Sequence, residues 1–475
     1  MNADNKAPNR PTSVAKSLAE STIRGLWISR VPHDPILHAL LALTLPMTFV
    51  NLVQQSYLIA DSIIVGHYVG LSGLAAIGGA QPVYYLVSSV FLGLLNGFTI
   101  RIAAFTGKGD DRARQAVVLG LGAFVLGWSV LCVVLVLFGA GSILTLMGVS
   151  GGLAIASVAY LHTLAIGLLP IFILGAITAL FRGMGQPKII MSVLAGSSLL
   201  NIVLAWLFVA VLRLGIRGAA LGTVCASTAS GAAALLMAMH RYSVHQYRAQ
   251  WTICLEHLRG SLRLGLPMGI QFIILSAGNL VLTSLVASFG PVALAGISIA
   301  ARIETVTSRV FLDLSGGVTV LVAQRRGSGE ITAVRRAVHV SLFCTWWATL
   351  AIVFIIVALH GRIGVVFTTS GNVTAIVSSY ILITYPFFPL FTLMAVAHGF
   401  LNGLGRTAIP LTCTIVSYIA VRVPVAILLS TRLGLSGVIW AVDIGWLVGA
   451  IYTALIVMLE LRKIRSFELN RAVFI

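Results

Sequence analysis

The sequence has little charge for its length. Only 9% of its 475 residues are Asp, Glu, Lys or Arg, against roughly 25% in a soluble globular domain. Acidic residues are the scarcest, with 13 Asp and Glu against 31 Lys and Arg. The apolar share is 58%, and the mean hydropathy is +1.01. This composition argues against one large soluble core and indicates an all-α polytopic membrane protein.

Groups that carry common chemistry are also scarce. The five cysteines are scattered, mostly within apolar runs, so we expect neither a disulfide framework nor a metal cluster. The glycines of "GKG" and "GMG" lack the strand, loop and helix context and the Lys-Ser/Thr pair of a nucleotide-binding loop. His162 and His398 each stand alone in an apolar segment, which favours packing over proton relay. We therefore expect a protein that is not an enzyme and uses no cofactor.

Apolar runs of about 20 residues, long enough for a helix to cross a bilayer, recur along the whole chain. Such long runs argue against an outer-membrane barrel, whose strands alternate over about ten residues. Residues 1–35 are polar and basic, and the first apolar run is long enough to span, so no cleavable signal is visible. The runs predict twelve transmembrane helices, near residues 37–64, 74–102, 116–138, 153–181, 189–211, 217–239, 262–287, 294–323, 337–358, 374–400, 409–431 and 436–460.

The net charge of +18 invites a nucleic-acid-binding interpretation, but the placement of the charge argues against it. If the N-terminus is cytoplasmic, nearly all Lys and Arg fall on the cytoplasmic side. The outside loops then hold only Arg213, Arg217, Arg362 and Arg432. This positive-inside distribution predicts that both termini lie in the cytoplasm. We expect a multi-pass protein of the bacterial inner membrane. The basic loops would contact anionic lipid of the bilayer, not nucleic acid.

The chain repeats itself. Residues 88–113 align without gaps to 308–333 at an offset of 220, and the same offset pairs Gly183-Met-Gly185 with Gly403-Leu-Gly405. Two six-helix bundles follow, and because six is even, both start on the same side of the membrane as a parallel repeat. Two such bundles around a central cleft can alternate access between the two sides, although a duplication kept only for structure is the alternative. The expected divisions are a tail (1–35), an N-lobe (36–240), an amphipathic cytoplasmic linker (241–261), a C-lobe (262–460) and a second tail (461–475).

Several stretches together resemble the multidrug and toxic compound extrusion (MATE) family over residues 36–460. They are "LPMTFVNLVQQSYLIADSIIVGHYVG", "FRGMGQPK", "LLNIVLAWLFV", "LGIRGAALGT", "VRVPVAILL" and "LGLSGVIWA". The major facilitator superfamily also has two sets of six helices. However, "GKGDDRAR" only superficially matches its characteristic loop, and "RRGSGEITAVRR" lacks the Asp-Arg pair. The MATE resemblance implies an antiporter that exports amphipathic organic compounds and draws on an ion gradient.

The resemblance also implies a coupling site in the N-lobe. Asp61 matches the family's aspartate of the first helix, and Asn201 and Thr223 match an asparagine and a threonine found in some members. The second aspartate of that pattern is absent, because its position holds Ala205. Sodium prefers several hard oxygen ligands with carboxylate charge. Proton coupling needs one carboxyl group, so we favour the proton over sodium as the coupling ion.

A second branch of the family uses carboxylates in helices seven and ten. Neither helix has one here, so Gln271 of helix seven is at most a polar residue of the cavity. On helix one, Gln54 and Asp61 fall within roughly 20° of one another and Tyr57 lies about 40° from Asp61, a stripe that must face protein or water. Helix two adds Gln81 and Tyr84. Together these residues predict a polar cavity around a proton site, although Asp61 could instead cap or pair near the end of its helix.

Helix eight carries a charged face of its own. Arg302, Arg309 and Asp313 share one side, and Arg309 and Asp313 are spaced for an i,i+4 ion pair. The pair is either structural or part of the substrate cavity. Arg422 and Asp443 lie in helices eleven and twelve, where a pairing between them is one option.

Two other functions compete with the exporter. A lipid-linked oligosaccharide flippase of the same wider superfamily would use a cationic cavity, for which the arginines of helix eight are candidates. A membrane-embedded enzyme would need clustered catalytic groups at membrane depth, which the sequence lacks. We expect a monomer that handles a small organic substrate within the lipid bilayer.

Overall fold

The computed structural model describes residues 34–147, 151–241 and 251–473, which form helices joined by short turns, with no strand among them. The N-terminal bundle contains α2 (Pro35–Tyr68), α3 (Leu71–Lys108), α4 (Asp111–Leu146), α5 (Gly151–Ile166), α6 (Leu168–Gly183), α7 (Pro187–Trp206), η2 (Leu207–Val211) and α8 (Gly215–Arg241). The C-terminal bundle contains α9 (Trp251–Ala287), α10 (Pro291–Gly327), α11 (Ile331–Ala358), α12 (His360–Phe367), α13 (Gly371–Thr384), η4 (Tyr385–Phe387), α14 (Phe388–Gly403), α15 (Ala408–Thr414), η5 (Ile415–Arg422), α16 (Val423–Leu433) and α17 (Leu435–Val473).

The number of spans agrees with the sequence. Eleven helical stretches of the described residues are long and apolar enough to cross a membrane, and the bent pair α5–α6 makes a twelfth. The span expected over 153–181 is present but is not one continuous helix, because the chain bends by 54° at Gly167. Pro170 lies in the first turn of α6 and has no N–H to donate to Ile166, so the helix of α5 cannot continue unbroken.

Three other spans depart from regular α-helix. The segments η2 and η5 are π-helical, and η4 is a short 3₁₀ segment around Pro386. π-Helical segments occur frequently at functional sites. The short helix α12 was not predicted, because its eight residues are too few to give a clear apolar period.

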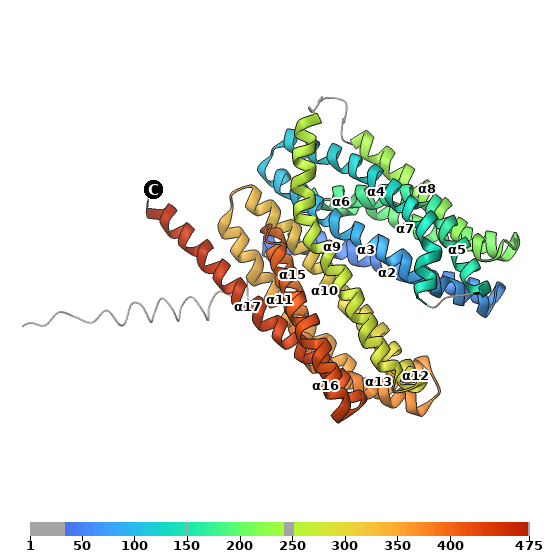
Figure 1. Cartoon of the computed structure of the whole chain (residues 1–475). Coiled ribbons are helices and arrows are strands. Elements are labelled where there is room, and N and C mark those ends of the chain that lie inside the picture. Colours follow the sequence, from blue (N-terminus) through green and yellow to red (C-terminus); the bar gives the residue numbers. More distant parts are fainter. Residues whose placement is uncertain (1–33, 148–150, 242–250, 474–475) are drawn as a thin grey trace, which may run out of the picture.

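The two bundles diverge from one end of the molecule, and α2, α3, α9 and α10 meet where they converge (Figure 1). Glycines allow the backbones to approach there. A Cβ on Gly93 would lie 2.3 Å from the Cα of Gly269, and one on Gly97 would lie 2.2 Å from the carbonyl oxygen of Ser261. Small residues are the usual means by which membrane helices pack this closely.

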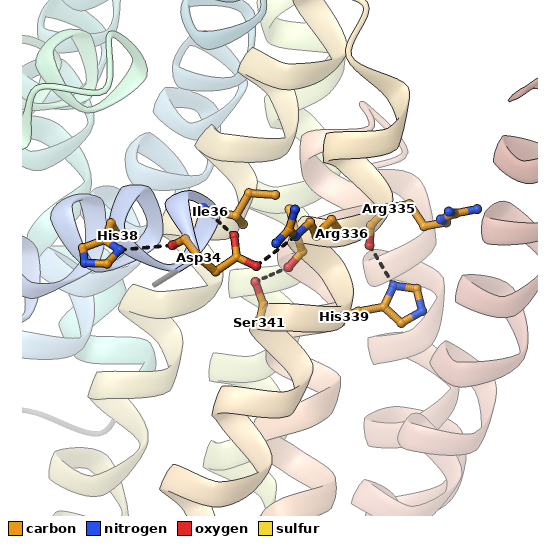
Figure 2. Close-up of polar contacts among 8 residues, drawn as sticks. Asp34, Ile36, His38, Arg335, Arg336, His339 and Ser341 are labelled. Atoms are coloured by element: carbon orange, nitrogen blue, oxygen red, sulfur yellow. Dashed lines mark hydrogen bonds and ion pairs between the residues drawn. The ribbon is translucent and has the colours of Figure 1, made fainter. Parts of the chain in front are cut away.

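An ion pair also joins the bundles at this end. Arg336 of α11 donates from Nε to Oδ2 of Asp34 over 2.9 Å, as Figure 2 shows. The other carboxylate oxygen of Asp34 accepts from the backbone N–H of Ile36 over 2.9 Å and so caps α2, with Pro35 in the first turn. Asp34 is 5% exposed, so a single buried carboxylate both starts the first helix and holds the opposite bundle.

Two helices run past the expected lobe boundaries, and the divisions of the chain stay a prediction. α9 begins at Trp251, inside the predicted linker, and α17 continues to Val473, inside the predicted C-terminal tail. The residues 242–250 of the linker and 1–33 of the N-terminal tail lie outside the described part of the chain. α3, in contrast, ends at a clear stop signal. Its C-cap is Gly109, whose φ of +71° is a left-handed conformation that glycine adopts readily.

Candidate transport site

Asp61 lies near the end of α2, two turns before Tyr68. Its Oδ1 atom is buried and accepts no hydrogen bond. Within the described ranges no Lys or Arg forms an ion pair with it, so the cap or pairing alternative for Asp61 finds no partner. A buried carboxylate without a donor is costly and is usually retained for function.

Tyrosines from three helices surround Asp61. Tyr57 of α2 and Tyr160 of α5 both interact electrostatically with the Asp61 carboxylate, and Tyr84 of α3 interacts with both tyrosines. Sequence reasoning had placed Tyr57 and Tyr84 near Asp61 but missed Tyr160, which lies about a hundred positions along the chain. A signal was available, since Tyr160 and Tyr380 are paired by the repeat offset of 220.

The structure brings Asn201 and Thr223 together. Asn201 of α7 donates from Nδ2 to Oγ1 of Thr223 in α8 over 3.1 Å, and the threonine hydroxyl is 3.3 Å from the carbonyl oxygen of Ala219. Asn201 is 5% exposed, and its Oδ1 has no donor. This side of the site therefore offers an amide oxygen as a free acceptor.

Packing places the acid and this pair at the same depth. Ile64 and Val65 of α2 form one apolar cluster with Ala205 of α7 and Ala219 of α8. Asp61 lies one turn before Val65, and Asn201 one turn before Ala205, on helices that run in the same direction. Thr223 lies one turn after Ala219 on the antiparallel α8. The coupling residues expected from the family resemblance thus share one level of the N-terminal bundle.

The remaining polar candidates are divided between the bundles. Gln54 is half-buried on α2, and Gln81 is exposed on α3, where its Nε2 donates to the hydroxyl of Tyr85 over 3.2 Å. Gln271 of α9 donates to Oγ1 of Thr414 over 2.9 Å, which ties it to α15 of its own bundle. The structure does not join these side chains into one cluster with Asp61, so their role in a cavity stays a prediction.

Arg309 and Asp313 form the expected i,i+4 pair, with Nε and Oδ1 3.6 Å apart. The same Oδ1 accepts from Nδ2 of Asn51 in the opposite bundle over 2.8 Å. Asp313 is 9% exposed, and Arg182 of α6 interacts electrostatically with it. These contacts were not predicted from α10 alone, and they make Asp313 a residue of the interface between the bundles.

The described residues contain no group of three or more His, Cys, Asp or Glu that could hold a metal ion. All five cysteines are free. His398 is buried and lies 3.2 Å from Oγ1 of Thr453, a packing role like the one expected.

The profile of the family described as MatE matches the chain twice, over residues 46–207 and 267–428. The two matches are offset by 221 positions, close to the internal repeat. Among curated proteins, the chain is 28% identical to the "Probable multidrug resistance protein NorM" of Deinococcus radiodurans, over 84% of this chain and 89% of that protein. It is 25% identical to the "Probable multidrug resistance protein YoeA" of Bacillus subtilis, over 83% and 87% of the two chains.

A solved structure agrees with the fold. The MOP superfamily transporter from Pyrococcus furiosus superposes with a TM-score of 0.83 at 22% identity, covering 92% of this chain and 98% of that one. At this identity the likeness concerns the fold alone. It agrees with the repeated helical bundles described above.

Proposed function

The chain belongs to the MatE family, and on this premise we propose that it is a proton-coupled antiporter that exports amphipathic organic compounds by alternating access. Its membrane fold and its multidrug-resistance relatives make it a transporter of the multidrug efflux class. The proposal concerns the coupling ion, the direction of exchange and the residues that carry them.

The observation that carries the proposal is the environment of Asp61. Its carboxylate lies among tyrosines, has an unpartnered buried oxygen, and pairs with no described cation. A carboxyl group in such a place is stable when it holds a proton and costly when it is ionised. Substrate binding or a change of conformation that wets the site would release that proton, which is the exchange that an antiporter needs.

The composition of the site favours a proton over sodium. Ala205 occupies the position of a second acid, and it is fully buried in the apolar cluster of α2, α7 and α8. Asn201 and Thr223 supply an amide and a hydroxyl but no charge. One carboxylate with two neutral oxygens is a weak sodium cage, whereas a proton needs only the carboxylate.

The contacts between the bundles support alternating access. They gather where α2 begins, where α3 and α10 end, and where α9 begins. The helix ends and turns on that side carry basic residues, which predict the cytoplasmic side: Lys108, Arg112, Arg325, Arg326 and Arg406. In our proposal this conformation is closed to the cytoplasm, and rocking the bundles apart at this end would open the site to the inside.

The substrate class follows from the relatives and the lining. Both curated relatives are named as multidrug resistance proteins, and tyrosine rings together with a single acid suit amphipathic organic cations. The flippase alternative loses support at Arg309, one of its candidate cationic groups, because Arg309 is paired with Asp313. We propose a monomer in the bacterial inner membrane with both termini in the cytoplasm.

Transport in proteoliposomes tests the proposal. The purified protein is reconstituted, and flux of a fluorescent organic cation is followed under a proton gradient or a sodium gradient imposed separately. We expect the dye to move in the direction opposite to proton flow, and we expect its transport rate not to change with sodium at constant pH. Sodium-driven transport with no response to a proton gradient would overturn the proposed coupling ion, and no transport of the organic cation under either gradient would overturn the substrate class.

A further inference from the structure

The C-terminal bundle contains a cluster of buried acidic side chains. Its residues lie at or close to the positions that the internal repeat pairs with the neighbours of Asp61 in the N-terminal bundle. The offset of 220 pairs Tyr84 with Glu304 and Tyr160 with Tyr380. Arg422 and Asp443 lie within two residues of the positions that match Asn201 and Thr223. The duplication therefore placed charged groups in the second half where the first half has tyrosine, amide and hydroxyl groups.

The side chains of this cluster come from four helical segments. The hydroxyl of Tyr380 in α13 donates to Oε2 of Glu304 in α10. The guanidinium of Arg422, at the end of the π-helical η5, stacks over the ring of Tyr418 with its Cζ atom 4.5 Å from the ring centre. The stem of Arg422 packs on Gly445 of α17, where a Cβ would lie 3.1 Å from the Cβ of the arginine.

Asp443, two residues before Gly445 on α17, has no hydrogen bond at all. It is 1% exposed, and both of its carboxylate oxygens are buried without a donor. Arg422 and Glu304 interact with it electrostatically, yet Nε of Arg422 has no acceptor either. An ionised carboxylate in this place would be unsolvated and unbonded, an arrangement that proteins rarely keep.

The charges that face Asp443 can be enumerated from the packed elements. Among the described residues, Arg422 of η5, Glu304 of α10 and Tyr380 of α13 interact electrostatically with Asp443. Tyr418 of η5 interacts with Arg422 and Glu304 and donates to the amide oxygen of Asn279 in α9. Two carboxylates thus share one guanidinium. One acid can be ionised against Arg422, and the other remains without a counter-charge.

We propose that Glu304 and Asp443 form a second proton-binding site, which holds one proton between two carboxylates in the C-terminal bundle. The added proton forms an O–H bond on one carboxyl group and makes the cluster neutral as a whole. A metal cation is a poorer occupant, because Arg422 already supplies a positive charge and no third acidic, His or Cys ligand is present among the described residues. The inference rests on the proposed antiport for its role, in which each bundle would carry its own proton.

Infrared difference spectroscopy of the purified full-length protein tests this site without any substrate. The C=O stretching band of protonated carboxyl groups is followed against pH for the wild type, Asp61→Asn, Asp443→Asn and Glu304→Gln. We expect the wild type to show two such titrations from buried carboxyl groups, besides those of its exposed acids. Asp61→Asn removes one, and either Asp443→Asn or Glu304→Gln removes the other. Glu330→Gln, an exposed acid paired with Arg325, is the control and leaves both in place.

Tyr380→Phe keeps the test valid if the acid variants fail to fold. It retains both acids and removes only the hydroxyl that donates to Glu304. We expect it to shift the band of the second titration. Spectra of Asp443→Asn, Glu304→Gln and Tyr380→Phe that all match the wild type would overturn the proposal. So would a second band that sodium alone removes at constant pH. Failure of proton-driven transport with the second titration intact would overturn the proposed function and leave this site standing.

Discussion

Asn51 donates a hydrogen bond from Nδ2 to Oδ1 of Asp313 over 2.8 Å, and this bond joins α2 of one bundle to α10 of the other. Arg309 lies 3.6 Å from the same oxygen, and Arg182 adds a third electrostatic contact from α6. Oδ2 of Asp313 remains buried without a donor. One carboxylate therefore joins the two bundles near the middle of α2 and α10, at a contact that must break if the bundles rock apart to open to the cytoplasm.

Loss of the bond between Asn51 and Asp313 should favour opening to the cytoplasm. Hydrogen bonds to charged groups contribute about 1.5–3 kcal/mol, so Asn51→Ala is expected to shift the equilibrium between the two states by roughly 10-fold to 100-fold. The measurement is a spin-label distance between positions 108 and 328, in the turns of opposite bundles, in a variant without its cysteines. Asn96→Ala is the control, since Asn96 donates only to Leu92 of its own helix. An unchanged distance distribution in Asn51→Ala would contradict this role.

The cap of α2 should matter for more than its own helix. Asp34→Ala removes both the N-cap of α2 and the ion pair with Arg336. Asp110→Ala removes the comparable N-cap of α4. The hydrogen-bond partner of Asp110, Ala113, and its ion-pair partner, Lys108, both lie in the same bundle as Asp110. An N-cap contributes about 1 kcal/mol, so both variants should lower the thermal unfolding temperature in detergent. The decrease should be larger for Asp34→Ala, and equal decreases would show that the pair with Arg336 adds nothing.

The N-terminal tail should be dispensable up to the cap. A truncation that starts at Val31 keeps Asp34 and should transport at the wild-type rate in vesicles. A truncation that starts at Ile36 loses Asp34 and Pro35 and should be less stable, for the reason given above. Loss of transport in the first truncation, despite normal insertion, would reject the expectation.

The ion choice can be altered at position 205. Ala205→Asp places a second carboxylate one turn from Asn201, which should make transport respond to sodium. Ala205 is fully buried and packs against α8, so the variant should also be less stable. Ala205→Asn has the same size without the charge and is the matched control. Equal sodium responses in the two variants would show that the missing acid does not decide the ion.

Much of the fold was predictable, because a helix must satisfy its own backbone within lipid. Apolar length therefore located the twelve spans, and the match of 88–113 to 308–333 located the duplication. The bend at Gly167 escaped prediction, because it depends on where Pro170 falls relative to the turn of α6. The π-helical η5 has no comparable sequence signal.

Residues of the candidate site could be predicted only where they share one helix face or match the family pattern. Gln54, Tyr57 and Asp61 share a face of α2, and the resemblance supplied Asn201 and Thr223 from two other helices. Contacts between distant helices could not be read from a single face. The bond from Asn51 to Asp313 and the group around Glu304 and Asp443 depend on tertiary packing that the helical period leaves open.

The central claim is that Asp61 carries the coupling proton, and substrate-linked proton movement across a liposome membrane tests it most directly. A pH-sensitive dye inside the liposome reports protons while a fluorescent organic cation is transported. The wild type should exchange protons for substrate. Asp61→Asn should reach the membrane in equal amount and unfold at a similar temperature but move no protons with the substrate. Asp111→Asn, an exposed acid paired with Arg114, should behave as the wild type. Wild-type proton exchange in Asp61→Asn would contradict the account.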